Sequence, residues 1–247
     1  MKRKTALCGC LLDVPIEEIP KLLTNDQVDL LEWRLDIFIQ KHSLKKTLEA
    51  LGFLSTEPRL PVLVTNRPVR EGGVLEMNEE LRLEVLRKAV GAGAEWVDLE
   101  EDTPESIVEE FKSRGTRTLL SHHVFSGTPD RLTLQRLAER MAIKKPHVLK
   151  IVTLAHAPED NLRVLDLIPF GRQELGMEVI AFCMGPAGRW SRFACLPLGS
   201  PWTYVQLPGP SVAAPGQFTA AEMRTILETG NWLEEMDTAK FPLRRGD

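Results

Sequence analysis

Short apolar or alternating stretches recur eight times along this chain, and a helical pattern follows each of them. Such a regular alternation predicts parallel strands joined by helices. Eight repeats in 247 residues match the size of a (β/α)8 TIM barrel. The expected strands are Thr5–Leu12, Leu30–Asp36, Pro61–Arg67, Glu95–Glu100, Arg117–Val124, Val148–Ala155, Glu178–Gly185 and Trp202–Leu207.

A doubly wound open sheet would also alternate strands with helices. The first expected strand, however, runs into Leu11–Pro15, which lacks the GxGxxG fingerprint of a dinucleotide-binding sheet. No Ser/Gly-rich linker divides the chain, so we predict an α/β fold with one (β/α)8 barrel catalytic domain over residues 1–247. The expected helices are Pro15–Thr24, His42–Leu51, Met77–Val90, Thr103–Ser113, Pro129–Lys144, Pro158–Phe170, Ser191–Leu196 and Ala220–Glu228.

The composition excludes several other classes of protein. With 31 Lys and Arg against 35 Asp and Glu, the net charge is −4, and no basic stripe could neutralise a nucleic-acid backbone. No apolar run reaches the ~18 residues of a membrane span, and no signal-peptide core follows the basic start Met1–Lys4. Cys8, Cys10, Cys183 and Cys195 have neither metal-site nor disulfide-framework spacing. We therefore expect a cytoplasmic enzyme with no nucleic-acid, membrane or metal partner.

Charged side chains occupy strand positions that a barrel would bury. In Leu30–Asp36, alternation places Glu32, Arg34 and Asp36 on one face and apolar side chains on the other. If the apolar face packs against helices, the three charges point into the barrel, where active sites of this fold lie at the C-terminal ends of the strands. An edge strand with one solvated face is the alternative interpretation.

Three further strands repeat this pattern. Asp98 and Glu100 share one face of a strand, and Arg67 ends another. Lys150 stands in the middle of the otherwise apolar stretch Val148–Val152. A buried lysine either pairs with a carboxylate or becomes a neutral amine, and the neutral amine is the form that attacks a ketone to make a Schiff base. The sequence leaves both interpretations of Lys150 open.

A Schiff-base enzyme also needs a proton carrier near neutral pH, and histidine is the usual choice. His122 and His123 end the strand next to that of the lysine, on opposite faces by alternation, and spacing alone does not decide between them. His156 follows the lysine strand and is a minor candidate. We expect His42, at a helix start, and His147, in a loop, to be solvated.

Taken together, these residues resemble the type I 3-dehydroquinase family, Schiff-base barrels of the shikimate pathway. The resemblance runs in unchanged order from Glu32 to Gln217. Each motif is weak alone, but seven in order at expected strand ends make a specific pattern. The motifs are Glu32-Trp33-Arg34-Leu35-Asp36, Thr65-Asn66-Arg67 with Glu71-Gly72-Gly73, Asp98-Leu99-Glu100, Ser121-His122-His123, Leu149-Lys150-Ile151, Met184-Gly185-Pro186-Ala187-Gly188-Arg189-Trp190-Ser191-Arg192, and Ala214-Pro215-Gly216-Gln217.

The resemblance implies dehydration of 3-dehydroquinate to 3-dehydroshikimate, catalysed by three residues. Lys150 would form an imine with the ring ketone of the substrate. His123 would remove the proton from the adjacent carbon and protonate the leaving hydroxyl, which settles the choice between the two histidines. Glu71 would orient and tune His123.

The resemblance also assigns the substrate contacts. Glu32, Arg34 and Arg67 would hold ring hydroxyls. Arg192 and Gln217 would hold the carboxylate, and the planar fork of an arginine suits that task. The resemblance further implies no metal and no organic cofactor, a small-molecule substrate, and a homodimer.

Three positions depart from the family pattern. Val124 stands where an acid or Asn usually follows the catalytic histidine, and Ile37 where some members have a histidine. Ala213 stands where a lid serine is usual, which would remove a hydrogen bond worth about 0.5–1.5 kcal/mol. A non-catalytic barrel that binds a shikimate-like acid is therefore one alternative.

Glycines in two loops support another alternative. Gly185 and Gly188 follow the seventh expected strand, and the stretch 208–216 follows the eighth. These loops cradle phosphate in many barrels, as a Schiff-base aldolase acting on a phosphorylated keto-sugar would require. Arg192 and Gln217 match a carboxylate site instead, and a Pro/Gly/Ala stretch is typical of a closing lid. The dehydratase is therefore our main prediction.

Overall fold

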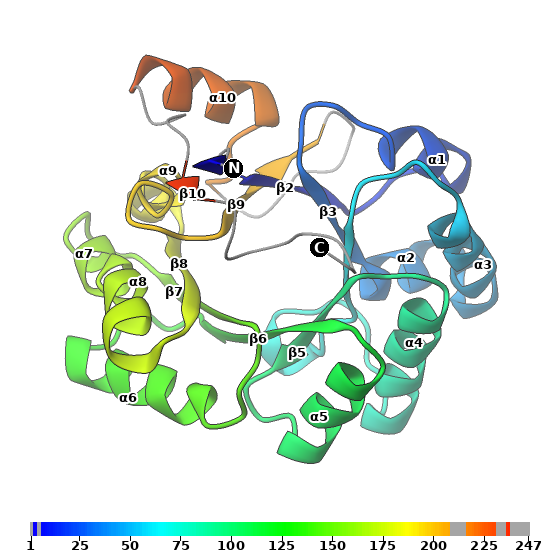
Figure 1. Ribbon diagram of the computed structural model, residues 1–247, viewed down its shortest axis with the longest axis horizontal. Coiled ribbons are helices and arrows are strands. Elements are labelled where there is room, and N and C mark those ends of the chain that lie inside the picture. Colours follow the sequence, from blue (N-terminus) through cyan, green and yellow to red (C-terminus); the bar gives the residue numbers. More distant parts are fainter. Residues whose placement is uncertain (1, 4–5, 208–215, 231–235, 238–247) are drawn as a thin grey trace.

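The computed structural model describes residues 2–3, 6–207, 216–230 and 236–237, and it confirms the predicted (β/α)8 barrel (Figure 1). Eight parallel strands pair in the order β8-β7-β6-β5-β4-β3-β2-β9. Each predicted strand is present, with ends that differ by at most two residues. The strands are β2 (Ala6–Leu11), β3 (Leu30–Arg34), β4 (Val62–Thr65), β5 (Trp96–Glu100), β6 (Arg117–Val124), β7 (Val148–Leu154), β8 (Glu178–Met184) and β9 (Trp202–Gln206).

Helices surround the strands on the outside (Figure 1). They are α1 (Ile19–Leu22), α2 (Leu35–His42), α3 (Leu44–Ala50), α4 (Glu79–Gly91), α5 (Glu105–Ser113), α6 (Arg131–Ala142), α7 (Asp160–Leu165), α8 (Leu167–Phe170), α9 (Ser191–Ala194) and α10 (Ala220–Thr229). Short helical turns are η1 (Ile16–Glu18), η2 (Leu51–Ser55), η3 (Val69–Glu71), η4 (Gly171–Leu175) and η5 (Pro186–Gly188). None of the helices described is long and apolar enough to cross a membrane.

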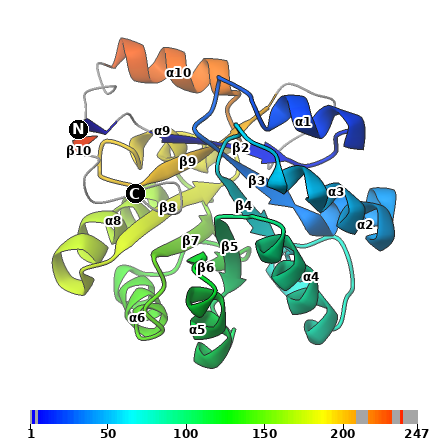
Figure 2. The same ribbon diagram turned by 45° about the vertical axis from the view of Figure 1, so that its right-hand side comes forward.

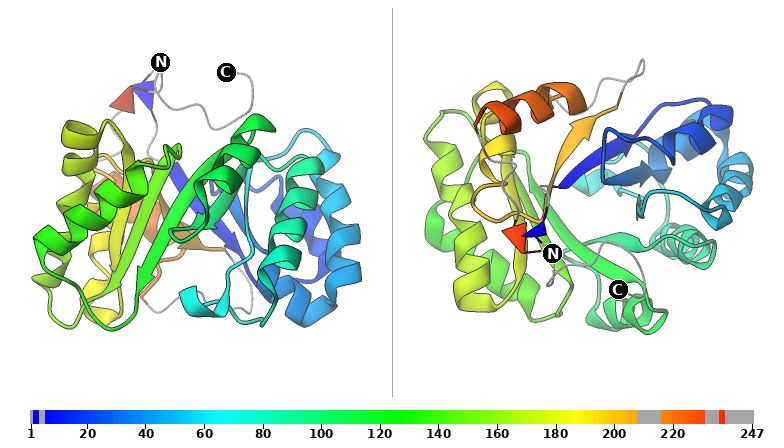
Figure 3. Two further views of the ribbon diagram at one scale, coloured as in Figure 1. Left: turned by 90° about the horizontal axis from the view of Figure 1, so that it is seen from below. Right: turned by 45° about the horizontal axis from the view of Figure 1, so that its top comes forward.

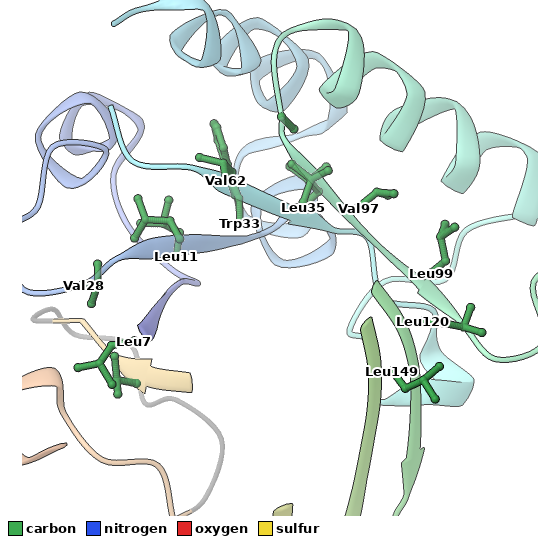
Figure 4. Packing of buried hydrophobic residues seen from close by; sticks show 14 of the residues in the cluster. Leu7, Leu11, Val28, Trp33, Leu35, Val62, Val97, Leu99, Leu120 and Leu149 are labelled. Atoms are coloured by element: carbon green, nitrogen blue, oxygen red, sulfur yellow. The ribbon is translucent and has the colours of Figure 1, made fainter. Parts of the chain in front are cut away.

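The alternation of the strands separates two hydrophobic clusters. Outward-facing side chains such as Trp33 and Leu149 pack with the helices in the larger cluster, part of which Figure 4 shows. Inward-facing side chains such as Leu30, Trp96 and Trp202, at the starts of their strands, form the smaller cluster inside the barrel. Burying a side chain of this kind contributes about 1.5–3 kcal/mol. Because this smaller cluster fills the barrel where the strands start, the polar inward-facing side chains lie where the strands end.

The strand order has two ends, β8 and β9. Within the described residues no backbone ladder joins these two strands, so the barrel has a seam there. Residues 185–201, with η5 and α9, connect them along the chain, and α9 contacts both strands (Figure 2).

A small antiparallel pair lies outside the barrel sheet. It is formed by β1 (Lys2–Arg3) and β10 (Met236–Asp237), with Lys2 opposite Asp237. Because β1 precedes β2 in the chain, the pair lies at the end of the barrel where the strands begin (Figure 3).

Two stretches of the chain, 30–51 and 158–170, divide into elements differently from the sequence prediction. Leu30–Asp36 is not strand throughout, because β3 ends at Arg34 and α2 begins with the next residue. Asp36 lies in the first turn of α2, where the helix dipole favours a carboxylate. The pattern His42–Leu51 therefore captures α3 and misses α2, and Pro158–Phe170 is divided into α7 and α8.

Candidate active site

Lys150 on β7 points into the barrel with only 5% of its surface exposed, level with Ser121 on β6. Its Nζ lies 3.5 Å from Asp98 Oδ2 and 3.8 Å from Glu32 Oε1. The ring centroid of Tyr204 is 4.3 Å from the same nitrogen. Of the two interpretations that the sequence left open, the structure shows the paired lysine. Two carboxylates and an aromatic face stabilise positive charge at this point.

Arg67 joins the polar side chains of β5 and β6. Its Nη2 donates to Asp98 Oδ2 at 2.5 Å, and its Nη1 donates to Glu100 Oε1 and Ser121 Oγ, both at 2.7 Å. Burial raises the pKa of Glu100 to about 7, against the opposing effect of Arg67. Burial also disfavours the ionised form of Asp98, but Arg67 and Lys150 hold the pKa of that carboxyl below its usual range.

Glu32 and Arg34 lie on β3, and a neighbour holds each of them. Thr65 Oγ1 donates to Glu32 Oε1 at 2.9 Å. Arg34 donates from Nε and Nη2 to the two carboxylate oxygens of Asp36, at 2.9 and 2.8 Å. This two-point pair fixes the plane of the guanidinium. The prediction that Asp36 lies on the inner face of the strand is therefore wrong, but Asp36 positions Arg34.

Glu71 ends η3, the turn that follows β4. Gly72 has a φ of +84°, and a Cβ at Gly73 would lie 1.9 Å from the carbonyl oxygen of Arg67. Both positions therefore require glycine. The N–H of Gly73 donates to the carbonyl oxygen of Pro68 at 3.0 Å and closes the turn. This path of the backbone carries the Glu71 side chain to the end of β6.

Glu71 contacts both histidines there. Its Oε2 accepts from the backbone N–H of His123 at 2.7 Å and from His123 Nδ1 at 3.0 Å, and its Oε1 lies 3.1 Å from His122 Nδ1. Burial opposes ionisation, but the hydrogen bonds from His122 and His123 hold the pKa of Glu71 well below its usual range. Because an ionised carboxylate only accepts, His123 Nδ1 carries a proton, and its Nε2 is free to act as a base.

The pKa values of the two histidines shift in opposite directions from that of an ordinary histidine. Burial lowers the pKa of His123 to about 3, although Glu71 acts against that shift. The hydrogen bond to Glu71 raises the pKa of His122, whose side chain is 28% exposed. Alternation predicts opposite faces for the pair, yet both reach Glu71, because it lies over the end of the strand. Burial, rather than contact with Glu71, distinguishes them.

Arg192 and Gln217 approach the site from the two sides of the seam. Arg192 on α9 is 2% exposed and its guanidinium lies 4.6 Å from the ring centroid of Phe182. Burial lowers the pKa of Arg192 to about 10, and its Nε has no hydrogen-bond partner among the described residues. Gln217 Nε2 lies 3.3 Å from Cys10 Sγ. The lid position Ala213 lies outside the described residues.

Two aromatic residues at the site were missed by the sequence analysis. Tyr204 is an inward position of β9, and the alternation along that strand could have identified it. The ring of Phe125, just after β6, stacks on His123 with a centroid separation of 6.1 Å and is 48% exposed. No periodicity marks Phe125, because it lies beyond its strand.

The remaining histidines lie outside this cluster. His147 and His156 are exposed. His42 was expected to be solvated but is half-buried, with its Nε2 3.1 Å from the carbonyl oxygen of Val14. Among the described residues, no cluster of three or more potential metal ligands is present.

The fold and the site together define the class of this protein. Charged and titratable side chains gather at the C-terminal ends of the strands around a buried lysine, which is where enzymes with a (β/α)8 barrel carry out their chemistry. Residues 9–233 also match the family described as type I 3-dehydroquinase. The chain belongs to this family, which confirms the resemblance seen in the sequence and makes the chain a hydro-lyase of the shikimate pathway.

Individual relatives agree with this assignment. The chain is 49% identical over 222 residues to the 3-dehydroquinate dehydratase of Syntrophobacter fumaroxidans, covering 90% of this chain and 95% of that protein. It is 37% identical over 223 residues to that of Thermococcus gammatolerans, covering 90% and 97%. The structure of the 3-dehydroquinate dehydratase from Geobacillus kaustophilus has a TM-score of 0.80 at 27% identity, with 92% of each chain covered. The type I enzyme from Clostridium difficile, at 22% identity and a TM-score of 0.80 over 93% of each chain, shares the fold.

Proposed function

We propose that this chain converts 3-dehydroquinate to 3-dehydroshikimate and water through an imine on Lys150. The observation that carries the proposal is the setting of this lysine: it is buried at the centre of the barrel, and two carboxylates face its Nζ. Schiff-base chemistry is characteristic of the family to which the chain belongs.

The first stage is formation of the imine. The neutral Nε2 of His123 would take a proton from the paired Lys150, whose free amine then attacks the ring ketone. The imidazolium returns the proton to the hydroxyl of this adduct, which leaves as water and gives a protonated imine. Asp98 and Glu32 lie 3.5 and 3.8 Å from the lysine nitrogen, so they stabilise the positive charge of that species. The protonated imine withdraws electrons and acidifies the neighbouring C–H bond, so a weak base is sufficient.

The second stage is elimination, with His123 as base and then as acid. Its neutral Nε2 takes the proton from the carbon next to the imine, and the electron pair moves into an enamine. The imidazolium returns that proton to the leaving hydroxyl, which departs as water. Hydrolysis of the imine uses one water and restores Lys150, so the net reaction removes a single water. Glu71 would orient His123 and stabilise its charged form.

The substrate contacts complete the proposal. Arg192 is a buried cation without a carboxylate partner among the described residues, so it would bind the substrate carboxylate together with Gln217. Glu32 and Arg34 on β3 and Arg67 just after β4 would hold the ring hydroxyls.

Borohydride trapping tests this proposal. We expect incubation with 3-dehydroquinate and borohydride to give a covalent adduct that peptide mapping places on Lys150, and Lys150→Met to abolish both adduct and turnover. Lys88→Met, at a half-exposed lysine of α4, is the matched control and should behave like the parent. An adduct that persists in Lys150→Met, or no adduct on a folded parent, would refute the imine.

We further propose that residues 1–247 form one catalytic domain, and that the enzyme acts as a homodimer in the cytoplasm. These features come from the resemblance to the family and from the composition of the chain. Light scattering of the purified chain would give its mass in solution, and a monomer at micromolar concentration would refute the dimer. Limited proteolysis that released a stable internal fragment would refute the single domain.

A further inference from the structure

His122 has no role in the reaction proposed above, yet it contacts the centre of the catalytic group. Glu71 presents two oxygens: Oε2 accepts both bonds from His123, and Oε1 faces Nδ1 of His122 at 3.1 Å. The two histidines therefore hold the carboxylate from both sides. Since Glu71 stands on a short turn rather than on a strand, its orientation depends on these contacts.

We propose that His122 is a positioning residue, which holds Glu71 in place for His123 and, on gaining a proton, makes His123 a weaker base. The inference rests on the proposed function, in which His123 is the base. It concerns a residue to which the resemblance to the family assigns no role.

The positioning effect follows from hydrogen bonding. A carboxylate held at one oxygen can still turn about its last side-chain bond, and turning would break the hydrogen bond that His123 Nδ1 donates to Glu71 Oε2. A second donor at Oε1 prevents that rotation. Neutral His122 supplies this donor as its Nδ1–H tautomer, and charged His122 supplies the same N–H. The positioning effect is therefore independent of pH.

The charge effect depends on pH. A proton on His122 neutralises Glu71 and opposes a second positive charge on His123, the charge that the base must acquire. The hydrogen bond to Glu71 raises the pKa of His122, whereas burial lowers that of His123, so as the pH falls His122 gains its proton before His123 does.

The other charges near the pair do not cancel this effect. Glu101 and Arg140 also act on His122, but Arg140 Nε donates to Glu101 Oε1 at 2.7 Å, so these two charges pair with each other. The charges of Arg67, Lys150 and Asp98 act on His123. They belong to the buried network, which His122 does not contact directly.

Two substitutions separate positioning from charge. In His122→Asn the side-chain amide keeps a donor close to the position of Nδ1 but cannot become charged. We expect its kcat at pH 9 to be within about 2-fold of the parent, while the acid limb of the kcat profile moves down by about one pH unit. His122→Leu removes both donor and charge, so we expect kcat to fall roughly 10-fold at pH 9 with KM nearly unchanged, and the acid limb to move down as in His122→Asn.

Several outcomes would overturn the inference. If both variants keep the kcat and the pH profile of the parent, or if KM rather than kcat changes, His122 is not a positioning residue. His156→Asn, at an exposed histidine outside the cluster, is the control and should match the parent. If a variant fails to fold, nitrogen-detected NMR titration of the parent replaces it: the signals of His123 should shift as His122 titrates, and independent titration would overturn the inference. A parent that binds but does not turn over 3-dehydroquinate would refute the proposed function, while the titration would still test His122.

Discussion

A single carboxylate oxygen of Glu71 accepts two hydrogen bonds from His123, one from the backbone N–H at 2.7 Å and one from Nδ1 at 3.0 Å. Strand β6 supplies the histidine, and a turn after β4 supplies the carboxylate. The backbone bond fixes where the oxygen lies, and the ring bond then fixes where the imidazole points. The catalytic orientation of His123 is thus determined by the path of a different strand-to-helix loop.

Replacing Glu71 with Gln should lower kcat and leave KM almost unchanged. The amide is close in shape, but it carries no charge to stabilise the imidazolium, so we expect kcat to fall roughly 10²-fold. Steady-state kinetics with 3-dehydroquinate would measure both constants. Glu109→Gln, at an exposed glutamate of α5, is the control. A Glu71→Gln enzyme with parental kcat would contradict the role of Glu71.

Arg192→Met should weaken substrate binding without weakening the fold. The charged hydrogen bonds to a carboxylate contribute about 1.5–3 kcal/mol, so KM should rise roughly 10- to 100-fold. A buried guanidinium without a carboxylate partner among the described residues stabilises the fold little, so Tm should stay the same or rise. Arg189→Met removes a half-exposed neighbour and should change neither value. A large fall in Tm with unchanged KM would show that Arg192 is structural.

The stability of the protein should fall in mild acid because of His123. Its pKa is about 3 in the folded chain, below the 6.5 of an unperturbed histidine. Between these values the unfolded chain binds the proton and the folded chain does not. The free energy of unfolding should therefore decrease as pH falls from 6.5 towards 3, by roughly 1 kcal/mol per pH unit.

Urea unfolding of the parent and of His123→Gln between pH 7.5 and 4.5 would test this pH dependence. The variant lacks the titrating ring, so its stability should change less over the same range. His122 contributes with the opposite sign, since its raised pKa favours the folded state at low pH, and it is present in both proteins. Equal slopes for the two proteins would show that His123 is not buried in its neutral form.

Gly73→Ala should damage both the fold and the activity. The added Cβ would lie 1.9 Å from the Arg67 carbonyl oxygen, so the turn that carries Glu71 must shift. We expect a loss of roughly 2 kcal/mol or more of unfolding free energy, together with a lower kcat. Gly52→Ala has nothing within 4 Å of the new carbon and is the matched control. Parental stability and kcat in Gly73→Ala would show that the turn adapts.

The inner face of the barrel was predictable because strands alternate strictly. The positions of Glu32, Asp98 and Lys150 follow from a period of two once the apolar face is known to pack against helices. The partner of the lysine was not predictable, because which carboxylate approaches Nζ depends on the register between strands. Asp36 was misplaced for a related reason: the alternating pattern continues one step after the backbone has already turned into α2.

The position of Glu71 could not be predicted from strand or helix periodicity, because this residue lies in a turn. Nothing local in Glu71-Gly72-Gly73 says that this side chain reaches β6; only the resemblance to a family placed it beside a histidine. The contact between Glu71 and His122 was not anticipated at all, because alternation assigns His122 to the outer face and takes no account of a side chain lying over the strand end.

The seam between β8 and β9 implies that the substrate would connect two strands that are not hydrogen-bonded to each other within the described residues. Arg192 follows β8 and Gln217 follows β9, and these strands share no backbone ladder in the part of the chain that is described. A substrate carboxylate bound by both side chains would link the two sides of the seam, where the described backbone itself provides no hydrogen-bonded connection between the strands. Binding of the substrate and closure of the barrel at the seam would then occur together. A molecule too short to contact both Arg192 and Gln217 would occupy the site without linking the two strands.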